Sequence, residues 1–518
     1  MNLAQILRNL FTGWLSVIVK TAIAIYMVPF LLSKLGQEGY GLIGLLGVVI
    51  GFSAVADLGL RKSLSRELTE LVHRRDRSSV KELCSTALML YLVIACLLSV
   101  VVMLNAHTIV GFFKVGEGQV DAAVTLMRSF VPLSFIASFI RPVFSAGLVA
   151  HHRFDWVNSG EAVFSILTSL GVFVALGPFN CGLWGWSAMT LLGSLMTLVV
   201  FFYLNRKLEV GVILDCRSFR FSRIKSLFRL GGHLYVLELT RSLSERADPL
   251  IVSGFFGPAG VALYMPASRI SQSLRPFVLM LSNQMHPMAT SQFVDNDTRQ
   301  LQQTLLIGTK FTVLLGGFVC AGLFMFAESF ASLWLGAVIG DDSQLVAMLI
   351  MGFSIIDFTG YCAGTQWPVL LGMARLKFLV CTQVISSIIN VIVSIYLVGY
   401  TSIGIVGVLY GTVVIELIRR PLMVWYTANV LDLKCVDYFL SSYLRPFLCS
   451  IVALLAAYWI QRFLSVDSYL RLIEVGVMCA LAWLATVWFV GLSKSERQYV
   501  RALGIRVKRR FACANVGG

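Results

Sequence analysis

The sequence predicts an all-α polytopic membrane protein with about fourteen transmembrane helices, arranged as two parallel six-helix repeats (lobes) around a central cavity, plus two C-terminal helices. Three observations lead to this fold class. Of the 518 residues, 57% are hydrophobic and 13% are charged, whereas a soluble protein has about 25% charged residues. The mean hydropathy is +0.81. Apolar runs of bilayer length recur along the chain, and parts of the first half recur in the second.

The apolar runs define the expected helices in order, since about 20 residues at 1.5 Å per residue cross a bilayer. The first six helices are expected at residues 10–32, 40–60, 83–105, 122–150, 158–177 and 181–204. The second six are expected at 230–256, 258–285, 305–327, 345–372, 378–399 and 405–425. Two more are expected at 446–461 and 472–492.

These helices give five expected parts of the chain. They are an N-lobe (1–204), a cytoplasmic amphipathic linker (205–229), a C-lobe (230–425), two additional helices (426–492) and a basic cytoplasmic tail (493–518). Residues 217–229 and 494–511 alternate apolar and basic residues at helical spacing. Both segments are therefore expected to anchor at the membrane surface.

A repeat search supports the two lobes. The segment 35–42 aligns with 256–263 at an offset of 221, Arg153-Phe154 with Lys377-Phe378 at 224, and residues 182–186 with 404–408 at 222. Six helices separate the copies, so the copies share one orientation, which places a cavity between parallel repeats. Each glycine match also has a purely structural explanation, because tight turns favour glycine.

The distribution of basic residues predicts the orientation. Of the 42 lysines and arginines, 30 are assigned to inner segments, 4 to outer loops and 8 to the spans when both termini are cytoplasmic. This bias follows the positive-inside rule. It explains the net charge of +15 through anchoring to anionic lipid, so no nucleic-acid partner is predicted.

The segment 231–257 is apolar enough to span, yet it is rich in charge. It carries Glu238, Arg241, Glu245, Arg246 and Asp248 near its middle, where an unpaired charge costs about 3 kcal/mol or more. Glu238 and Arg241 are three residues apart, and Arg241 and Glu245 are four apart, so either pair can form on a helix. The stripe is either a polar pathway facing a watery cavity or an ion-pair zipper that joins two helices.

Further cations lie in other expected spans. The candidate substrate-binding residues are Lys20, Arg128, Arg141, Arg241, Arg269 and Arg275. Helices one and seven begin the two repeats and helix eight follows, so cations from these helices are expected to line one cationic cavity. The alternative is that they pair structurally with Asp57, Glu161, Glu238, Asp357 or Glu416.

No P-loop is present, so an ion gradient or the membrane potential would drive transport. The candidate ion-coupling residues are Asp57, Glu238, Glu245, Asp248 and Asp357. Arg241 and Arg246 are expected to hold Glu245 and Asp248 ionised. Asp57 and Asp357 have fewer cations nearby in sequence and are expected to protonate more readily. A substrate that competes for Arg241 would free Glu245 to take up a proton.

Signatures of catalysis and metal binding are absent from the sequence. The eleven cysteines and six histidines form no CxxC pair, no HExxH motif and no metal-ligand spacing. The longest expected outer loops, 106–121 and 328–344, are short for a polymerase or ligase acting outside the membrane. No metal, no cofactor and no enzymatic activity are therefore predicted.

Several motifs resemble those of a known superfamily. The parallel repeat, the Pro-Phe-Leu-Leu…Leu-Gly…Gly-Tyr-Gly-Leu junction (29–42), Asp-Leu-Gly-Leu (57–60) with Arg66 downstream, and the Arg-Phe and Lys-Phe pairs resemble the MOP superfamily. Within it the chain is most similar to the polysaccharide transporter family of Wzx-type flippases. Fourteen spans resemble MurJ and some exporters, whereas many O-antigen flippases have twelve, which leaves the sub-branch open.

The resemblance implies a bacterial inner-membrane flippase. Its expected substrate is an undecaprenyl-pyrophosphate-linked oligosaccharide, an O-antigen or exopolysaccharide repeat unit, moved to the periplasmic leaflet by alternating access. A polysaccharide polymerase is a further expected partner, besides membrane lipids. The first alternative is a MATE-type cation or drug antiporter, for which a carboxylate-rich cavity would be expected. A membrane polysaccharide polymerase or ligase is the alternative from another class.

Overall fold

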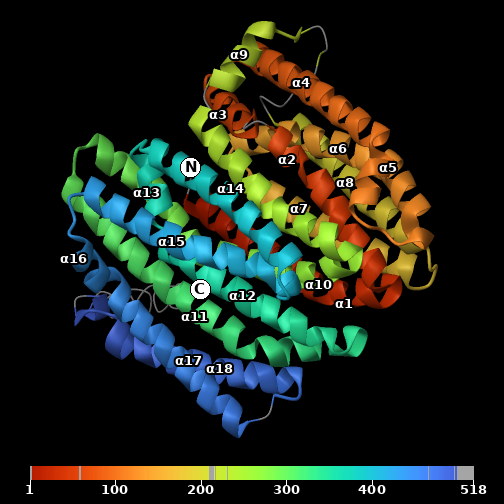
Figure 1. The fold of residues 1–518 in the computed structure, drawn as a ribbon. Helices are drawn as coiled ribbons and strands as arrows, with labels where there is room; N and C mark the ends of the chain where they lie inside the picture. The colour runs from red at the N-terminus through yellow and green to blue at the C-terminus, as the bar shows by residue number, and fades with distance from the viewer. Residues whose placement is uncertain are drawn as a thin grey trace, which may run out of the picture. The chain divides into compact units, whose positions relative to one another are not determined.

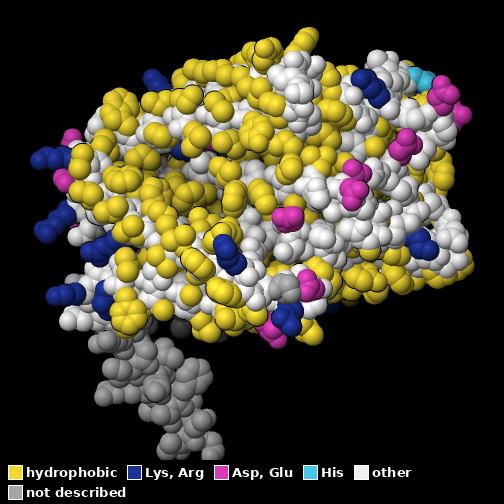
Figure 2. All heavy atoms as spheres, turned by 60° about the horizontal axis from the view of Figure 1, so that its bottom comes forward, with side chains coloured by type: hydrophobic (Ala, Val, Ile, Leu, Met, Phe, Trp, Pro, Cys, Tyr) yellow, Lys and Arg dark blue, Asp and Glu magenta, His cyan; other side chains and the backbone are white. Residues whose placement is uncertain are grey.

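A computed structural model describes residues 3–57, 60–208, 215, 218–229, 232–464, 466–494 and 496–498. Every regular element in this part of the chain is a helix (Figure 1). Figure 2 shows hydrophobic side chains covering most of the visible face. An example is the outer surface of α14 (Leu376–Tyr400), where Ile385, Ile388 and Ile392 are each more than half exposed. Such apolar exposure is suited to contact with lipid.

Eleven helical segments of the described chain are long and apolar enough to cross a membrane. Two of them are 46 and 60 residues long, at least twice the length that a bilayer requires. The first, Phe11–Ala56, runs through α1 (Leu3–Gly51) and α2 (Ser53–Ala56), and the second, Tyr235–Val294, lies in α10 (Gly232–Val294). The non-helical residues Gly36 and Gly257 interrupt α1 and α10. Each therefore supplies two spans, and the charged helix α15 (Gly407–Val430) completes the predicted fourteen.

The backbone repeats the same joints in both halves. Gly36 and Gly257 have φ values of 71° and 67° and are 221 residues apart. The other residues with positive φ that recur at offsets of 221 to 226 are Arg75 with Asn296, Lys114 with Gly340, His152 with Ala374, and Gly182 with Gly404. Non-glycine residues rarely adopt positive φ, so this recurrence supports the internal repeat independently of residue identity.

Hydrogen bonds around one joint repeat as well. The amide N–H groups of residues 74–77 donate to residues 70, 72, 71 and 75, and those of 295–298 donate to 291, 293, 292 and 296. The following helices, α4 (Arg77–Leu104) and α11 (Thr298–Ile339), each begin at an aspartate cap, Asp76 or Asp297. The N–H and hydroxyl donors of Ser79 and Ser78 hold the pKa of Asp76 at about 2.

The described chain forms two compact units. Unit 1 comprises residues 1–273, 338–349 and 376–415. Its core is formed by α4, α6 (Val120–Ala150), α7 (Phe154–Leu176) and α8 (Gly182–Arg206), which pack on one another and on α1. Close approach requires small residues: a Cβ at Gly193 of α8 would lie 1.8 Å from Thr168 Oγ1 of α7. Short helices α2 (Ser53–Ala56), α3 (Leu60–His73) and α5 (Ala106–Phe112) complete this part.

Unit 2 comprises residues 274–337, 350–375 and 416–518 and is organised along α11. The C-terminal helices α16 (Cys435–Phe439), α17 (Arg445–Phe463) and α18 (Tyr469–Thr486), with π-helical turns at Leu440–Leu444 and Val487–Gly491, follow one another there (Figure 1). They are bonded to α11 at Leu306, Thr309, Met325 and Leu333. The two predicted extra helices are therefore built into unit 2. Helices α12 (Asp342–Cys362) and α13 (Gln366–Gly372) complete the description.

The expected parts of the chain differ from these units, and the lobe boundaries stay a prediction. In the linker, α9 (Phe221–Arg229) packs on α3 and α4, and Arg223 donates to Ser79 Oγ at 2.8 Å. In its described part, this predicted membrane-surface anchor therefore contacts other helices of the protein, and Arg223 makes a polar bond to one of them. Residues 209–214, 216 and 217, most of the tail 493–518, and Leu58 and Gly59 of the predicted motif lie outside the described residues.

The two longest predicted outer loops are helical over most of their length. The first contains α5 and a 3₁₀ turn at Glu117–Gln119, and the second is largely the continuation of α11 to Ile339. The prediction of loops there was wrong because apolar runs locate the membrane-spanning part of a helix and not its end.

Candidate functional site

Two cations occupy equivalent places in the repeats of unit 1. Lys20 lies sixteen residues before Gly36 in α1, and Arg241 lies sixteen residues before Gly257 in α10. Lys20 Nζ donates to Glu161 Oε2 of α7 at 2.6 Å. The position equivalent to Glu161, nine residues after the positive-φ joint, is Gln383 in α14. Both repeats therefore have a cation at this position, but the residue at the partner position is a glutamate in the first repeat and a glutamine in the second.

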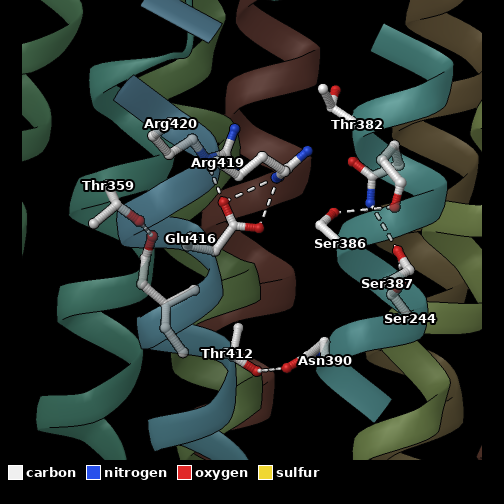
Figure 3. A network of polar contacts seen from close by, with 12 residues as sticks. Ser244, Thr359, Thr382, Ser386, Ser387, Asn390, Thr412, Glu416, Arg419 and Arg420 are labelled. Atoms are coloured by element: carbon white, nitrogen blue, oxygen red, sulfur yellow. Dashed lines mark hydrogen bonds and ion pairs between the residues drawn. The ribbon is translucent and has the colours of Figure 1, made fainter. Parts of the chain in front are cut away.

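One of the two pairs predicted within the charged stripe, Arg241 with Glu245, is present. Arg241 Nε lies 3.0 Å from Glu245 Oε1, and the two side chains are 57% and 49% exposed. One residue before Glu245, Ser244 Oγ bonds to Ser387 Oγ of α14 at 2.6 Å (Figure 3). A zipper would enclose its ion pair between helices, whereas this pair is open. The Ser244–Ser387 bond is one contact between α10 and α14, and both of its groups are uncharged.

Asp248 has a different environment from the predicted one. Its Oδ2 accepts a hydrogen bond from the Tyr264 hydroxyl at 3.1 Å, across the Gly257 joint of α10. Its Oδ1 is buried and has no hydrogen-bond partner among the described residues. The Arg246 guanidinium lies against Gly51, where an added Cβ would be 1.6 Å from Nη1. The expectation that Arg246 holds Asp248 ionised was wrong, because the two neighbours in sequence point to different partners.

Asp357 is also placed differently from the prediction. Its carboxylate, whose side chain is 3% exposed, lies 3.0 Å from Arg275 Nη2 within unit 2. It was expected to protonate readily because few cations are near it in sequence, but a cation reaches it from another helix, 82 residues away in sequence. This contact follows the structural-pairing alternative for Arg275.

The remaining predicted residues are less constrained. Asp57, at the end of α2, accepts from the buried Tyr91 hydroxyl at 2.7 Å, and Glu238 acts on Asp57 electrostatically. Arg128 and Arg269 are exposed and Arg141 is half-buried. These three arginines form no ion pair with the described residues.

Sequence reasoning missed a buried charged cluster in α15. We call Glu416, Arg419 and Arg420 the α15 triad. Arg419 Nη2 lies 2.7 and 3.0 Å from the two carboxylate oxygens of Glu416, and Arg420 also pairs with Glu416 (Figure 3). Both arginines fall inside the predicted span 405–425, although the predicted orientation assigns them to the inner segments. Their i, i+3 and i, i+4 spacing from Glu416 was the available signal.

Comparison with known proteins gives concordant results. Residues 32–338, more than half of the chain, match the family model described as "Polysaccharide biosynthesis protein". The chain is 22% identical to "Uncharacterized membrane protein EpsK" of Bacillus subtilis (strain 168), covering 92% of this chain and 94% of that protein. It is 21% identical to a Shigella flexneri protein named "Putative O-antigen transporter", with 68% and 81% covered.

Two solved structures share the fold. A multidrug resistance MATE family transporter of the MOP superfamily, in an inward-facing conformation, gives a TM-score of 0.70 at 17% identity, covering 80% of this chain and 98% of that chain. The lipid II flippase MurJ, in an inward closed conformation, also gives 0.70, at 16% identity, with 93% and 98% covered. The chain therefore belongs to the polysaccharide biosynthesis protein family and shares the fold of a MOP-superfamily transporter and of the lipid II flippase MurJ.

Proposed function

We propose that the chain is a flippase that moves an undecaprenyl-pyrophosphate-linked oligosaccharide from the cytoplasmic to the periplasmic leaflet of the bacterial inner membrane. The cargo would be an O-antigen or exopolysaccharide repeat unit, handed to a polymerase after transport. The observation that carries this proposal is the pair of cations, Lys20 and Arg241, at equivalent positions of the two repeats. One similar protein is named as a putative O-antigen transporter and another as a lipid II flippase, and these names support a lipid-linked glycan as the substrate.

The exposure and weak pairing of these two cations suit them to bind pyrophosphate. Lys20 and Arg241 each pair with one glutamate, and all four side chains are between one third and three fifths exposed. An exposed pair is worth only about 0–1 kcal/mol, so a multiply charged phosphate can displace the glutamate at little cost. Guanidinium and ammonium groups are the usual partners of phosphate. Arg269, Arg128 and Arg141 would add positive charge, and Arg275 would do so only after leaving Asp357.

Alternating access supplies the transport step. A two-lobe transporter can open in turn to each side around a site near the membrane midplane. The membrane potential is worth about 2.3 kcal/mol per charge for 100 mV, and a proton gradient would add to it. Of the acids proposed for coupling, Asp248 is the strongest candidate, because its partner is a neutral hydroxyl and not a cation. Asp57 also accepts from a tyrosine hydroxyl but has Arg61 nearby, whereas Glu245 and Asp357 are paired with arginines.

The two alternative functions, a cation antiporter and a polymerase or ligase, would require different features from those found. A cation antiporter requires carboxylates that face the cargo without neutralising arginines, and here Glu161 and Glu245 are both paired with cations. A relative is named as an O-antigen transporter, and the predicted outer segments are short. Both observations support a carrier in preference to a polymerase or ligase.

The test is transport by variants of the two equivalent cations. We expect Lys20→Ala and Arg241→Ala to lower the rate of glycan-lipid translocation by about 10- to 100-fold, because each loses one charged contact of about 1.5–3 kcal/mol. Arg241→Lys should recover part of the rate, since lysine keeps the charge without the planar fork. Translocation is measured in a deletion strain as labelled glycan-lipid accessible from the periplasm.

The matched control is Lys434→Ala, an exposed basic residue before α16. It should transport like wild type at equal expression. Wild-type rates for both Ala variants would exclude the paired-cation site. A deletion strain that exports its glycans normally but loses drug resistance would instead favour the antiporter.

A further inference from the structure

The two repeats meet along a seam that lies within unit 1. We define the outer seam as the contacts of residues 36–51 and 112–114 in the first repeat with residues 246–265 and 342 in the second. In this seam a Cβ at Gly41 would lie only 1.7 Å from the carbonyl oxygen of Pro258. Glycine is required for so close an approach, because any other residue would place a carbon atom inside that carbonyl group.

The outer seam follows the symmetry of the repeat. Gly44 and Met265 each lie eight residues after the joint glycine of their repeat, so they are equivalent positions. They also meet, since a Cβ at Gly44 would lie 3.2 Å from Met265 Cγ. In a two-fold interface, residues contact their own equivalents at the axis. The axis that relates the two repeats therefore passes through the contact between Gly44 and Met265.

The joints on both sides of this axis bond to the opposite repeat. Near the joint of the second repeat, Ser253 Oγ donates to the Phe113 carbonyl oxygen at 3.3 Å. Beside the joint of the first repeat, Gln37 Nε2 donates to Asp342 Oδ2 at 2.8 Å. Phe113 and Asp342 lie within two residues of a recurring pair of positive-φ positions. The seam is therefore closed in equivalent ways on either side of the axis.

One end of the outer seam reaches the charged stripe of α10. Arg246 lies against Gly51 of the first repeat, where a Cβ would be 1.6 Å from Nη1. Arg241, proposed above to bind the cargo, is five residues before Arg246 in the same helix. The helix that carries this cation therefore also contributes to the seam.

We propose that the outer seam is a gate between the repeats that opens toward the predicted outer side, and that its closure requires glycine at position 41. Tightly packed interfaces switch between discrete arrangements instead of deforming gradually. Separation about the axis at Gly44 and Met265 would therefore release the contacts at both joints together. The passage of a glycan-lipid through this gate rests on the proposed function, whereas the opening of the seam does not.

The first experiment measures opening by the reactivity of a buried thiol. Ser253→Cys places this thiol at a fully buried position of the seam. A membrane-impermeant maleimide is added to right-side-out vesicles, and labelling of the chain without Ser253→Cys is subtracted. The rate follows the population in which the thiol is exposed. We expect slow labelling that Gly41→Ala accelerates about tenfold or more, because overpacking against the Pro258 carbonyl opposes closure.

The matched control is Gly47→Ala, the same change in the same helix. Gly47 is exposed, and a Cβ there would meet nothing within 4 Å, so labelling should stay slow. Gly51→Ala should have a smaller effect than Gly41→Ala, since the end of the Arg246 side chain can move aside and the backbone of Pro258 cannot. Equal labelling of Gly41→Ala and Gly47→Ala would overturn the proposal. So would rapid labelling of Ser253→Cys with no other change.

An exchange of residues at the axis distinguishes a gate from a folding defect. Gly44→Met places two large side chains opposite each other and should accelerate labelling. Adding Met265→Gly restores one large and one small residue, so labelling should return toward the slow rate. General destabilisation has the opposite result, because a further glycine inside a helix is itself destabilising. Labelling that stays fast in the double variant would refute the axis and the symmetric gate.

A reversible cross-link tests the gate during transport. Gln37→Cys and Asp342→Cys are joined by a bifunctional methanethiosulfonate, which a reductant cleaves. The joined protein should lose most of its glycan-lipid translocation relative to either single variant under the same treatment, and the reductant should restore it. Undiminished translocation by the joined protein would overturn the gate. Labelling as expected in a chain that translocates no glycan-lipid would leave the gate intact and refute the proposed function.

Discussion

At the scale of single residues, partners far away in sequence decide what each charged side chain can do. Asp248 and Asp357 both lie in membrane-spanning helices, yet one meets the Tyr264 hydroxyl and the other the Arg275 guanidinium. An ion pair keeps a carboxylate charged, whereas burial beside a neutral group favours the protonated form. We therefore propose Asp248 as the candidate for the coupling step, because its partner is a neutral hydroxyl.

This difference predicts opposite effects of two similar substitutions. Asp248→Asn mimics the protonated acid, so we expect a folded protein whose transport rate no longer responds to a pH gradient. Asp357→Asn should instead lower the free energy of unfolding by up to about 3–5 kcal/mol, because it breaks a buried pair. Solvent that reaches Arg275 will reduce this loss. Rates in proteoliposomes with an imposed gradient, together with unfolding curves, check both. An unchanged gradient response in Asp248→Asn would remove Asp248 from the coupling step.

At the scale of elements, the C-terminal helices depend on α11. Lys310 in α11 donates to Glu496 at 2.5 Å, and Glu496 also accepts from the backbone N–H of Ser493 at 2.7 Å just after the last membrane helix. Burial raises the pKa of Glu496, but the bonds from Lys310 and Ser493 outweigh it and hold this pKa below the usual range. The carboxylate thereby fastens the beginning of the basic tail to unit 2.

The lowered pKa predicts how this fastening depends on pH. A depressed acid contributes stability above its unfolded pKa of about 4.3 and loses that contribution as pH falls through its folded value. We expect Glu496→Gln to unfold more easily than wild type by about 1–3 kcal/mol at pH 7, the cost of leaving Lys310 without its partner. Unfolding curves of both proteins should converge below pH 4. A constant gap down to pH 3 would contradict this.

At the scale of the whole molecule, the two halves repeat one backbone design while their charges diverge. The joints recur from Gly36 and Gly257 to Gly182 and Gly404. In contrast, the α15 triad has no charged counterpart in the first half, where the positions 222 residues earlier are Ser194, Thr197 and Leu198. The joint geometry therefore recurs in both halves, whereas the charged residues of the triad do not.

The repeat and the basic-residue bias together predict the topology. Reporter fusions near residues 75 and 215 should be cytoplasmic, and fusions near 114 and 341 periplasmic, because an even number of spans separates equivalent joints. Activity of alkaline phosphatase and of a cytoplasmic reporter at each site checks this. A periplasmic signal at 215 would show that the first half has an odd number of spans.

Residue order alone predicts the helical fold class, about fourteen spans and the internal repeat, and its motifs resemble those of a superfamily whose fold the chain shares. Hydrophobic length, glycine at tight joints and residue spacing are local properties, so they can be read along the chain. The pairing of Arg241 with Glu245 was predictable for the same reason. Only the tertiary structure decided that Asp248 meets Tyr264, that Asp357 meets Arg275 and that α11 carries the C-terminal helices. These outcomes depend on which helix faces pack together, and that packing joins residues that no spacing in the sequence connects.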